Sequence, residues 1–408
     1  MCSLIKEFNI MTMKIAVIGA KGLPPKQGGI EHYCAEVYPR IVAQGHSVDL
    51  FARSSYTDTA WLGNYDFQGV RVISLPGIDA RGADAFVTSA LGAIAATAER
   101  YDIVHFHALG PALFTFLPRI ANSAKIVVTC QGLDWQRAKW GSFSTRLIQG
   151  GEQAAVRFAH GMVVVSDALK TYFAETYGRD TVYIPNAPAS YGESDLSFTY
   201  GKKLGLESGR YMIFVGRIVP EKRPDLLIEA FSKLQAPGWK LVLAGGVSDT
   251  QSYTSQLLEK VANNPNIIFA GELRGPRLWE IVRGAGMFVL PSDLEGLPLA
   301  MLEAMQEGIP VVASDILPHQ QLINGGMGTL FMAGNTDSLV SSLDWAIRHP
   351  QQVAAMAKNA QRNIQLNYSW EHITAENLKL YKTLLNSPQP VGASKSREVR
   401  LARVGSKE

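Results

Sequence analysis

The chain contains 408 residues, of which 47% are hydrophobic and 18% are charged. These values are ordinary for a packed soluble protein and exclude a disordered chain, a coiled coil and a disulfide-stapled miniprotein. At roughly 150 residues per domain, the length predicts two or three domains. The longest weakly polar run, residues 85–98, is shorter than the roughly 20 residues of a membrane-spanning helix, so we expect it to be buried in a core.

The formal net charge of +3 is concentrated in the C-terminal tail. Residues 391–408 hold five basic and two acidic side chains, which sum to +3, so the rest of the chain sums to zero. A neutral body argues against nucleic acid as a partner. The three cysteines, Cys2, Cys34 and Cys130, are scattered without metal-type spacing, and no signal peptide is visible. We therefore expect a cytoplasmic protein with free thiols, no bound metal and no cofactor.

Short β-branched runs alternate with amphipathic stretches through the first half of the chain. A helix is predicted from Ile30 to Val42, after Gly28-Gly29. The predicted strands are 14–18, 48–51, 70–74, 103–106, 126–129, 162–165 and 182–184. This alternation predicts a parallel sheet with helices on both faces.

The alternation pauses in a polar segment, 186–201, and then resumes with predicted strands 211–215, 240–243, 267–269, 287–290 and 311–313. The predicted fold class is α/β, with two Rossmann-like doubly wound parallel-sheet domains facing each other across a cleft. Ligands of such sheets bind beyond the carboxyl ends of the strands. The expected parts are an N-terminal domain (1–188, completed by helix 370–386), a linker (189–200), a C-terminal domain (201–369) and a basic disordered tail (387–408).

The glycines after the first strand do not match a dinucleotide fingerprint. Gly19-Ala-Lys-Gly22 lacks the G-x-G-x-x-G spacing, and the second strand ends in Arg53 instead of an acid, which disfavours an NAD-dependent oxidoreductase. Gly28 and Gly29 stand at a predicted helix start, where free N–H groups and the helix dipole favour an anion. An ordinary pair of loop glycines is the alternative interpretation.

The second domain begins with a similar arrangement. Gly216 and Arg217 follow strand 211–215, and Lys222 comes shortly after. Gly216 lets the backbone approach a ligand, and the two cations suit phosphate oxygens. A basic cluster is often just a solvated surface, but its position at a strand end favours a binding site.

The most specific segment is 290–303. Glu295 falls in a loop before a helix predicted to start near Pro298, and Glu303 lies on the second turn of that helix among apolar neighbours. A carboxylate in such surroundings costs free energy unless it accepts hydrogen bonds, and vicinal sugar hydroxyls are suitable donors. Protein amides are the alternative donors.

These motifs together resemble the family-4 retaining glycosyltransferases of the GT-B fold. Glu295 and Glu303, separated by seven residues, are preceded by Gly216-Arg217 and by Glu-Lys-Arg at 221–223. Segments 21–31 and 132–141 are similar to a bacterial branch that works in polysaccharide assembly. The resemblance covers about residues 13–384. It departs from the family at Cys130-Gln131, where many relatives carry a histidine before Gly-x-Asp.

The resemblance implies roles for single residues. Arg217 and Lys222 would hold the nucleotide diphosphate, Glu295 the donor sugar and Glu303 the ribose. His107 would lie near the bond being broken; a pair of satisfied histidines at a strand end, His105 and His107, is the alternative interpretation. The implied catalytic residues are His107, Arg217, Lys222 and Glu295. The implied donor-binding residues are Gly28, Gly29, Gly216, Arg217, Lys222, Glu295, Gly296, Leu297 and Glu303. Asp134 and Trp135 are weaker acceptor-side candidates.

The implied activity is retaining transfer of a hexose-type sugar from a nucleotide-diphosphate sugar to a glycan or lipid-linked acceptor in cell-surface polysaccharide biosynthesis. No Asp-x-Asp motif occurs, which fits metal-independent members of the GT-B class. A GT-B-like nucleotide-sugar epimerase is the first alternative. A bilobed binding protein and an NAD-dependent oxidoreductase are the others.

A cluster of aromatic and basic residues suggests a second partner. The cluster comprises Trp135, Arg137, Lys139, Trp140 and Arg146. If these side chains share one face, they would favour a peripheral contact with the inner face of the plasma membrane. A solvated helix with two packed tryptophans is the alternative interpretation.

Overall fold

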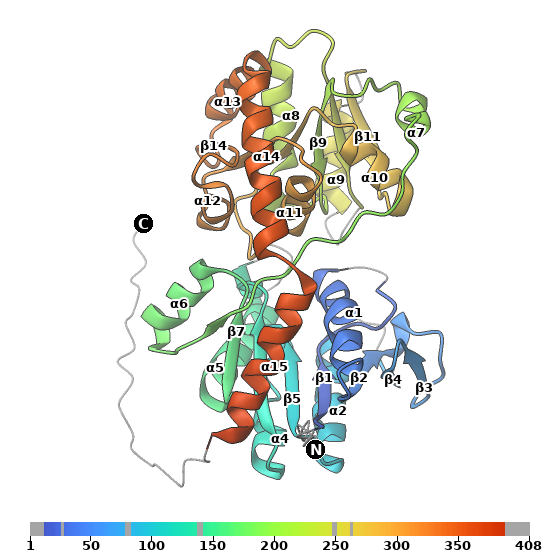
Figure 1. Cartoon of the computed structure of the whole chain (residues 1–408), viewed down its shortest axis with the longest axis vertical. Helices are drawn as coiled ribbons and strands as arrows, with labels where there is room; N and C mark the ends of the chain where they lie inside the picture. The colour runs from blue at the N-terminus through green and yellow to red at the C-terminus, as the bar shows by residue number, and fades with distance from the viewer. Residues whose placement is uncertain are drawn as a thin grey trace, which may run out of the picture.

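The computed structural model describes residues 12–25, 28–77, 83–136, 142–246, 251–261 and 264–387. Two domains are stacked along the long axis of the molecule (Figure 1). Each is built on a sheet of the predicted kind, so the α/β prediction with two doubly wound sheets is confirmed.

The N-terminal sheet has the strand order β3-β4-β2-β1-β5-β6-β7-β8, and all of its pairs are parallel except β3 with β4. The predicted strands agree with it to within one or two residues, but β3 was missed. Its strands are β1 (Lys14–Ile18), β2 (Ser47–Arg53), β3 (Asn64–Phe67), β4 (Val70–Leu75), β5 (Ile103–His107), β6 (Lys125–Cys130), β7 (Gly161–Val164) and β8 (Val182–Tyr183). Its helices are α1 (Gly29–Val42), α2 (Ala83–Ala98), α3 (Leu109–Ala112), α4 (Phe116–Ala121), α5 (Ser142–Phe158) and α6 (Asp167–Tyr177).

The C-terminal sheet is wholly parallel, in the order β11-β10-β9-β12-β13-β14. The sequence patterns missed β14. Its strands are β9 (Tyr211–Val215), β10 (Lys240–Ala244), β11 (Ile267–Gly271), β12 (Met287–Leu290), β13 (Val311–Ser314) and β14 (Thr329–Phe331). Its helices are α7 (Thr199–Lys203), α8 (Pro224–Lys233), α9 (Gln251–Val261), α10 (Gly275–Arg283), α11 (Leu299–Gln306), α12 (Leu317–Ile323), α13 (Thr336–Arg348) and α14 (Pro350–Asn367).

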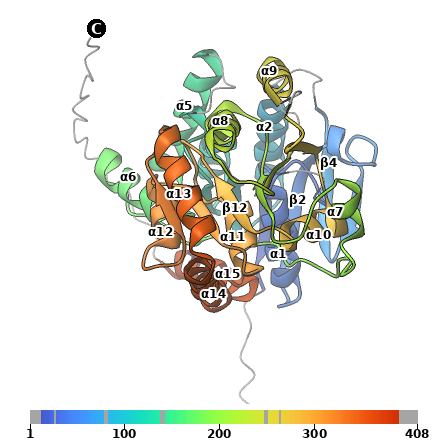
Figure 2. The same ribbon diagram turned by 90° about the horizontal axis from the view of Figure 1, so that it is seen from above.

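Alternation along the strands divides the N-terminal core into two layers. In β1, Ile15 and Val17 pack under α1 and the last helix, α15 (Trp370–Asn386), whereas Ala16 and Ile18 face the opposite core. Figure 2 shows this division from above, with α1 and α15 on one side of the molecule and α2 and α5 on the other. The apolar run 85–98 forms most of α2, and two of its alanines, Ala93 and Ala96, are buried. No helix within the described ranges is long and apolar enough to span a membrane.

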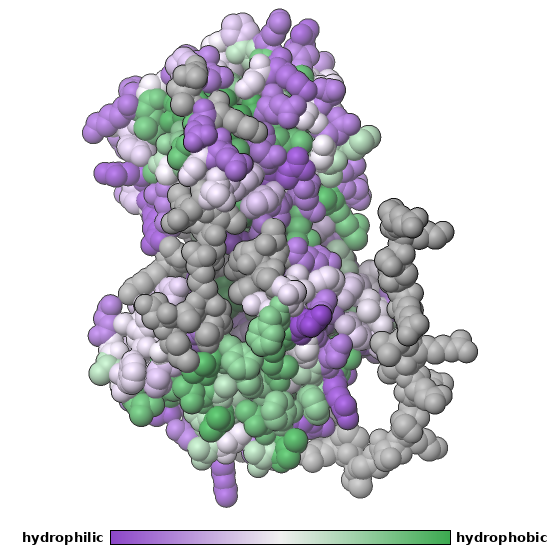
Figure 3. Space-filling view, turned by 180° about the vertical axis from the view of Figure 1, so that it is seen from behind, coloured by the Kyte–Doolittle hydropathy of each residue, from purple (hydrophilic) through white to green (hydrophobic). Residues whose placement is uncertain are grey.

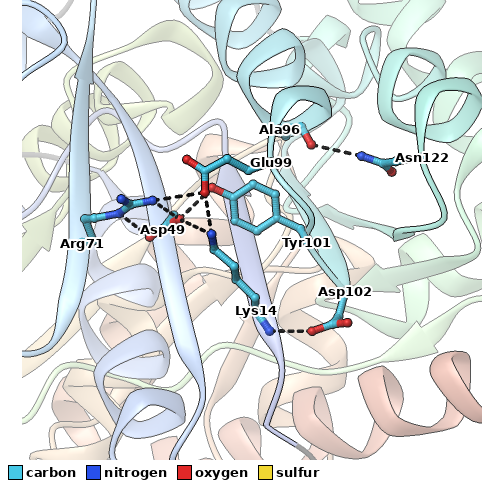
Figure 4. A network of polar contacts seen from close by, with 8 residues as sticks. All are labelled: Lys14, Asp49, Arg71, Ala96, Glu99, Tyr101, Asp102 and Asn122. Carbon is cyan, nitrogen blue, oxygen red and sulfur yellow. Dashed lines mark hydrogen bonds and ion pairs between the residues drawn. The ribbon is translucent and has the colours of Figure 1, made fainter.

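A polar network closes the amino-terminal edge of the first sheet (Figure 4). Asp49 accepts hydrogen bonds from Arg71 Nε at 2.7 Å and from the Tyr101 hydroxyl at 2.7 Å. Lys14 pairs with Glu99 at 2.5 Å, and its backbone N–H donates to Asp102. Because these groups satisfy one another at the edge where strands begin, the opposite edge is the one left for a ligand.

Candidate active site in the interdomain cleft

Both sheets reverse their strand order in the same way. The reversal lies between β1 and β5 in the first sheet and between β9 and β12 in the second. A crevice opens at such a switch point because the connections on either side run to opposite faces of the sheet. The residues singled out from the sequence follow these four strands, except for Glu303 on α11 and the 130–135 segment after β6.

A small pocket lies where the two domains meet. Gly132 and Leu133, from the loop after β6, form its N-terminal wall. The opposite wall comes from the loops after β9 and β12 and consists of Arg217, Glu221, Lys222, Leu294, Glu295 and Gly296. The structure therefore brings together Arg217, Lys222, Glu295 and Gly296, four residues that the sequence had suggested for one site.

An ion pair forms the centre of this pocket. Lys222 Nζ donates to Glu295 Oε1 at 2.6 Å, and Ser292 Oγ donates to the same oxygen at 2.8 Å. Burial alone would raise the pKa of Glu295, but the Lys222 ammonium, His319 and the Ser292 hydroxyl outweigh it, so the pKa is lowered. Glu295 is therefore ionised at neutral pH. Arg217 lies beside them, with Nη2 3.9 Å from Glu221.

Gly296 allows the two domains to touch. A Cβ added there would lie 2.1 Å from the carbonyl oxygen of Gln131. The next residue, Leu297, packs against the cores of both domains. Gly216 is also confined, since a Cβ would lie 3.2 Å from Lys222 Cδ. Small residues at these positions let the backbone approach the cations and the facing domain closely.

Helix α1 points its first turn toward the second domain. Gly28, with φ of 98°, is its N-cap and, within the described ranges, no capping hydrogen bond from a side chain is made there. A Cβ on Gly29 would lie 3.1 Å from Leu299, the first residue of α11. Glu31 accepts the backbone N–H of Lys21 at 2.8 Å, which ties the loop after β1 to the helix. The helix start is thus at the interface, with N–H groups suited to an anion.

Glu303 lies on α11 and contacts the interdomain linker. Its Oε2 accepts a hydrogen bond from the Tyr191 hydroxyl at 3.1 Å, and the Ala189 N–H also donates to the carboxylate. Burial raises its pKa to about 7, against the lowering effect of these two donors. The donors in this structure are thus a phenol and an amide of the protein, the second of which is the kind that the alternative interpretation named.

His107 ends strand β5 and is fully buried with His105. Its Nε2 lies 2.7 Å from the Tyr38 hydroxyl, and the two histidine rings stack at 4.3 Å. Burial lowers the pKa of His107 to about 3, so the ring is neutral at physiological pH. Its Nδ1 has no hydrogen-bond partner among the residues that the structure describes. The predicted contact with substrate stays a prediction, since the side chain is packed among protein groups here.

The acceptor-side candidates lie in a short turn, Asp134–Gln136, after β6. Trp135 donates its indole N–H to Glu152 at 2.8 Å, and the hydroxyl of Tyr172 donates to the same carboxylate. Trp135 is therefore a packed tryptophan, as the alternative interpretation stated. The role of Asp134 and Trp135 toward an acceptor stays a prediction. Arg137, Lys139 and Trp140 lie outside the described residues, and Arg146 is exposed on α5.

The sequence patterns did not identify several residues that shape the site. Ser292 and Glu221 were not singled out, although both flank residues that were. Tyr191 lay in a segment interpreted only as a linker. Gln131 was noted only as a departure from a family pattern, and Gly132 only as the first residue of segment 132–141. Apart from Tyr191, which follows β8, these residues shared one signal: they come after strands β6, β9 and β12, at the edge where both sheets present their loops.

This cleft could bind an anion through its cationic side chains and its backbone N–H groups. Arg217 and Lys222 supply fixed positive charge, and the first turn of α1 supplies backbone N–H groups at the interface. In the described ranges, no group of three His, Cys, Asp or Glu side chains could hold a metal ion.

Comparisons with known proteins agree with this architecture. Residues 28–187 match the glycosyl transferase 4-like domain, and residues 199–363 match glycosyl transferases group 1. A D-inositol 3-phosphate glycosyltransferase of Rhodococcus erythropolis is 25% identical over 405 residues, covering 90% of this chain and 91% of the relative. Sucrose-phosphate synthase of Thermosynechococcus elongatus superposes with a TM-score of 0.76 at 20% identity, covering 91% of this chain and 99% of the other. Anabaena HepE in complex with UDP and glucose gives 0.73 at 20% identity, covering 91% and 100%.

The two stacked parallel-sheet domains and the cleft between them define the GT-B fold. The protein is a glycosyltransferase of this fold, and its two domains match the glycosyl transferase 4-like and group 1 family models. The enzyme class and the fold expected from the sequence are thus confirmed.

Proposed function

We propose that the enzyme transfers a hexose-type sugar, with retention of anomeric configuration, from a nucleotide-diphosphate sugar to a glycan or a lipid-linked acceptor in cell-surface polysaccharide biosynthesis. The observation that carries the donor part is the Lys222–Glu295 pair at 2.6 Å, with Arg217 in the same interdomain pocket. A cation can bind the diphosphate of a nucleotide sugar, and a carboxylate beside it can accept hydrogen bonds from the hydroxyls of the sugar. The polysaccharide assignment rests on the resemblance of segments 21–31 and 132–141.

Charge stabilisation is the main catalytic effect in this proposal. Breaking the anomeric bond builds negative charge on the departing diphosphate. Lys222 has three N–H donors, so it can keep Glu295 and still reach a phosphate oxygen. Arg217 and the first turn of α1, at Gly28 and Gly29, would add donors from both domains. Such groups are already oriented before reaction, so they cost little reorganisation.

Glu295 and Glu303 would bind the two polar ends of the donor. The ionised Glu295 would accept hydroxyls of the sugar, next to Gly296 and Leu297, and Glu303 would accept the ribose hydroxyls. His107, neutral because of its lowered pKa, would act as a hydrogen-bonding group near the sugar and not as a cation. For retention we favour front-face attack, in which the leaving phosphate oxygen takes the proton of the acceptor hydroxyl.

Replacing Lys222 tests the diphosphate assignment. We expect Lys222→Ala to lower transfer by about a hundredfold or more, because one preorganised contact to the leaving group is lost. Lys233→Ala is the matched control, since Lys233 also pairs with carboxylates, at 3.0 Å and 3.3 Å, but on the exposed surface of α8. Turnover of both variants with a panel of nucleotide sugars, alongside circular dichroism, makes the comparison. Near-normal turnover by Lys222→Ala would refute the assignment.

An epimerase is the second candidate, and product analysis separates the two. An epimerase converts the nucleotide sugar alone, whereas a transferase needs an acceptor hydroxyl to form a new glycosidic bond. Chromatography of the donor after incubation with and without acceptor therefore distinguishes them. The R. erythropolis relative is named for D-inositol 3-phosphate, so this compound belongs in the acceptor panel beside glycans and lipid-linked sugars.

A lipid-linked acceptor requires the enzyme to reach a membrane surface, and we include a peripheral contact in the proposal. Helices α2, α4 and α5 cover the rear of the N-terminal domain, and Figure 3 shows hydrophobic residues gathered on that side. Arg146 and Arg157 are exposed on α5, whereas Glu152 of the same helix is buried. Apolar groups beside cations match an anionic lipid surface. The large apolar side chains exposed on the described parts of these three helices are Phe86, Ile94, Phe116, Ile120 and Phe143.

A further inference from the structure

The first part of the linker between the domains, residues 189–194, is bound tightly to the C-terminal domain. The Tyr191 ring stacks on Trp279 of α10, with centroids 6.0 Å apart and planes inclined by 27°. Gly192 lies against the same indole, where a Cβ would come within 2.6 Å of a ring carbon. The linker therefore follows the surface of α10 closely at these two residues.

Arg283 fixes the same part of the linker through its guanidinium. Its Nη1 donates to the carbonyl oxygen of Gly192 at 2.7 Å and to Ser194 Oγ at 2.9 Å. Its Nη2 donates to the carbonyl oxygen of Tyr191 at 3.3 Å, and its Nε pairs with Glu307 at 2.7 Å. A guanidinium that donates to four acceptors leaves the Tyr191 backbone little freedom.

The outer end of Tyr191 reaches the Glu303 carboxylate. The hydroxyl donates to Oε2 at 3.1 Å, and Ala189, two residues earlier, supplies a backbone N–H to the same carboxylate. Gln306, one turn further along α11, donates to the carbonyl oxygen of Ala189 at 3.2 Å. These two donors to Glu303, the Tyr191 hydroxyl and the Ala189 N–H, both come from the linker. The linker is itself held by contacts with α10 and α11.

A carboxylate has about four lone-pair sites, so two donors from the linker leave capacity for two hydroxyls of a ligand. The linker donors also limit the orientations that the carboxylate can adopt. A carboxylate held in one orientation loses less conformational entropy when a vicinal diol binds to it. A group that positions the carboxylate therefore strengthens binding of the diol, whereas a group that only donates a hydrogen bond to a buried acid does not.

We propose that Tyr191 is a positioning residue for the ribose subsite, which orients the Glu303 carboxylate toward the 2′- and 3′-hydroxyls while Trp279 and Arg283 hold the linker in place. This inference rests on the proposed ribose role of Glu303. It makes the linker part of the nucleotide site. Tyr191 itself does not touch the ligand in this proposal; it acts by orienting Glu303.

The test compares ribose with a sugar that lacks both hydroxyls. The probe is whichever of ADP, GDP and UDP raises the melting temperature of the parent most, together with its 2′,3′-dideoxy form. Titration calorimetry on the parent, Tyr191→Phe, Glu303→Gln and Tyr172→Phe gives each dissociation constant. Tyr172→Phe is the matched control, because its hydroxyl also donates to a carboxylate, Glu152, at 2.7 Å, but in the other domain.

We expect Tyr191→Phe to weaken binding of the ribonucleotide by about tenfold, the effect of losing one hydrogen bond to a charged group. Binding of the dideoxy form should stay within about twofold of the parent, so discrimination between the two sugars falls. Tyr172→Phe should keep the discrimination of the parent. Equal weakening of both probes by Tyr191→Phe would indicate a purely structural linker and overturn the proposal.

Glu303→Gln separates this proposal from the one on which it rests. If Glu303→Gln loses discrimination but Tyr191→Phe retains it, the ribose role of Glu303 stands and the role of Tyr191 is refuted. If Glu303→Gln retains full discrimination, or if the parent shows none, the ribose assignment itself fails and this inference fails with it. Melting curves of the four proteins without ligand check that each is folded.

Discussion

At the residue scale, Glu303 is the group whose surroundings most strongly change its chemistry. Burial raises its pKa from 4.5 to about 7, so the folded protein holds the carboxyl partly protonated near neutral pH. The unfolded chain ionises it at lower pH. Ionisation of the unfolded chain therefore lowers the free energy of unfolding as pH rises from 4.5, and the loss is complete only above about 7, where the folded state ionises as well. The ionised form of Glu303, which would bind hydroxyls, is thus the form that the fold stabilises less.

This difference gives a pH-dependent prediction. We expect Glu303→Gln to gain stability relative to the parent between pH 5 and pH 8, by at most about 3 kcal/mol, because the amide never ionises. Urea unfolding of both proteins at the two pH values measures the difference. Glu229→Gln is the control, since Glu229 is 57% exposed. A stability difference between parent and Glu303→Gln that does not change with pH would contradict the prediction.

At the element scale, the decisive contact is between two loops. The loop from β12 to α11 meets the loop after β6 at Gly296, where the Gln131 carbonyl leaves no room for a Cβ. Lys222 and Glu295 lie on one side of this contact, and Gly132 and Leu133 lie on the other. The spacing between the loops therefore sets how closely groups from the two domains approach one substrate.

We expect Gly296→Ala to lower kcat/KM by tenfold to about a hundredfold, because the loops must separate and groups in the pocket shift by a fraction of an ångström or more. The melting temperature should change little, since each domain keeps its own core. Gly150→Ala is the control, because an added Cβ on this α5 glycine would make only an ordinary 3.4 Å contact. Steady-state kinetics of both variants against the parent is the measurement, and unchanged kinetics for Gly296→Ala would count against a shared interdomain site.

At the scale of the whole molecule, helices α2, α4 and α5 belong to the N-terminal domain, which forms one wall of the interdomain cleft. If that domain rests on a membrane, the second domain is left to bind a donor from solution. We expect the full chain to sediment with vesicles of phosphatidylglycerol and much less with phosphatidylcholine alone, and to be released by salt. Phe143→Ser with Arg146→Ser should reduce binding, with Arg348→Ser on α13 as control. Equal sedimentation with both lipids, or none, would retire the membrane contact.

Much of the architecture was predictable because strand and helix signals are local. Runs such as 14–18 and 211–215 are largely apolar and are followed directly by glycine, and both appear as strands with those limits. β3 and β14 were missed because they are short, and neither is a continuous apolar run: Asn64–Phe67 is an antiparallel edge strand with a half-exposed pattern. Buried central strands carry their pattern in the sequence, whereas an edge strand depends on its neighbour.

The sequence by itself determined the two doubly wound domains and the residue types at the carboxyl ends of their strands, since both follow from hydrophobic periodicity and from the chemistry of single side chains. Only the tertiary structure decided which partners those side chains have. Lys222 meets Glu295 across 73 positions of the chain, and Tyr191 meets Glu303 across 112. His107 is enclosed by Tyr38 from a different element. Such pairs arise from the packing of loops and helices from distant segments, and no local pattern encodes that distance.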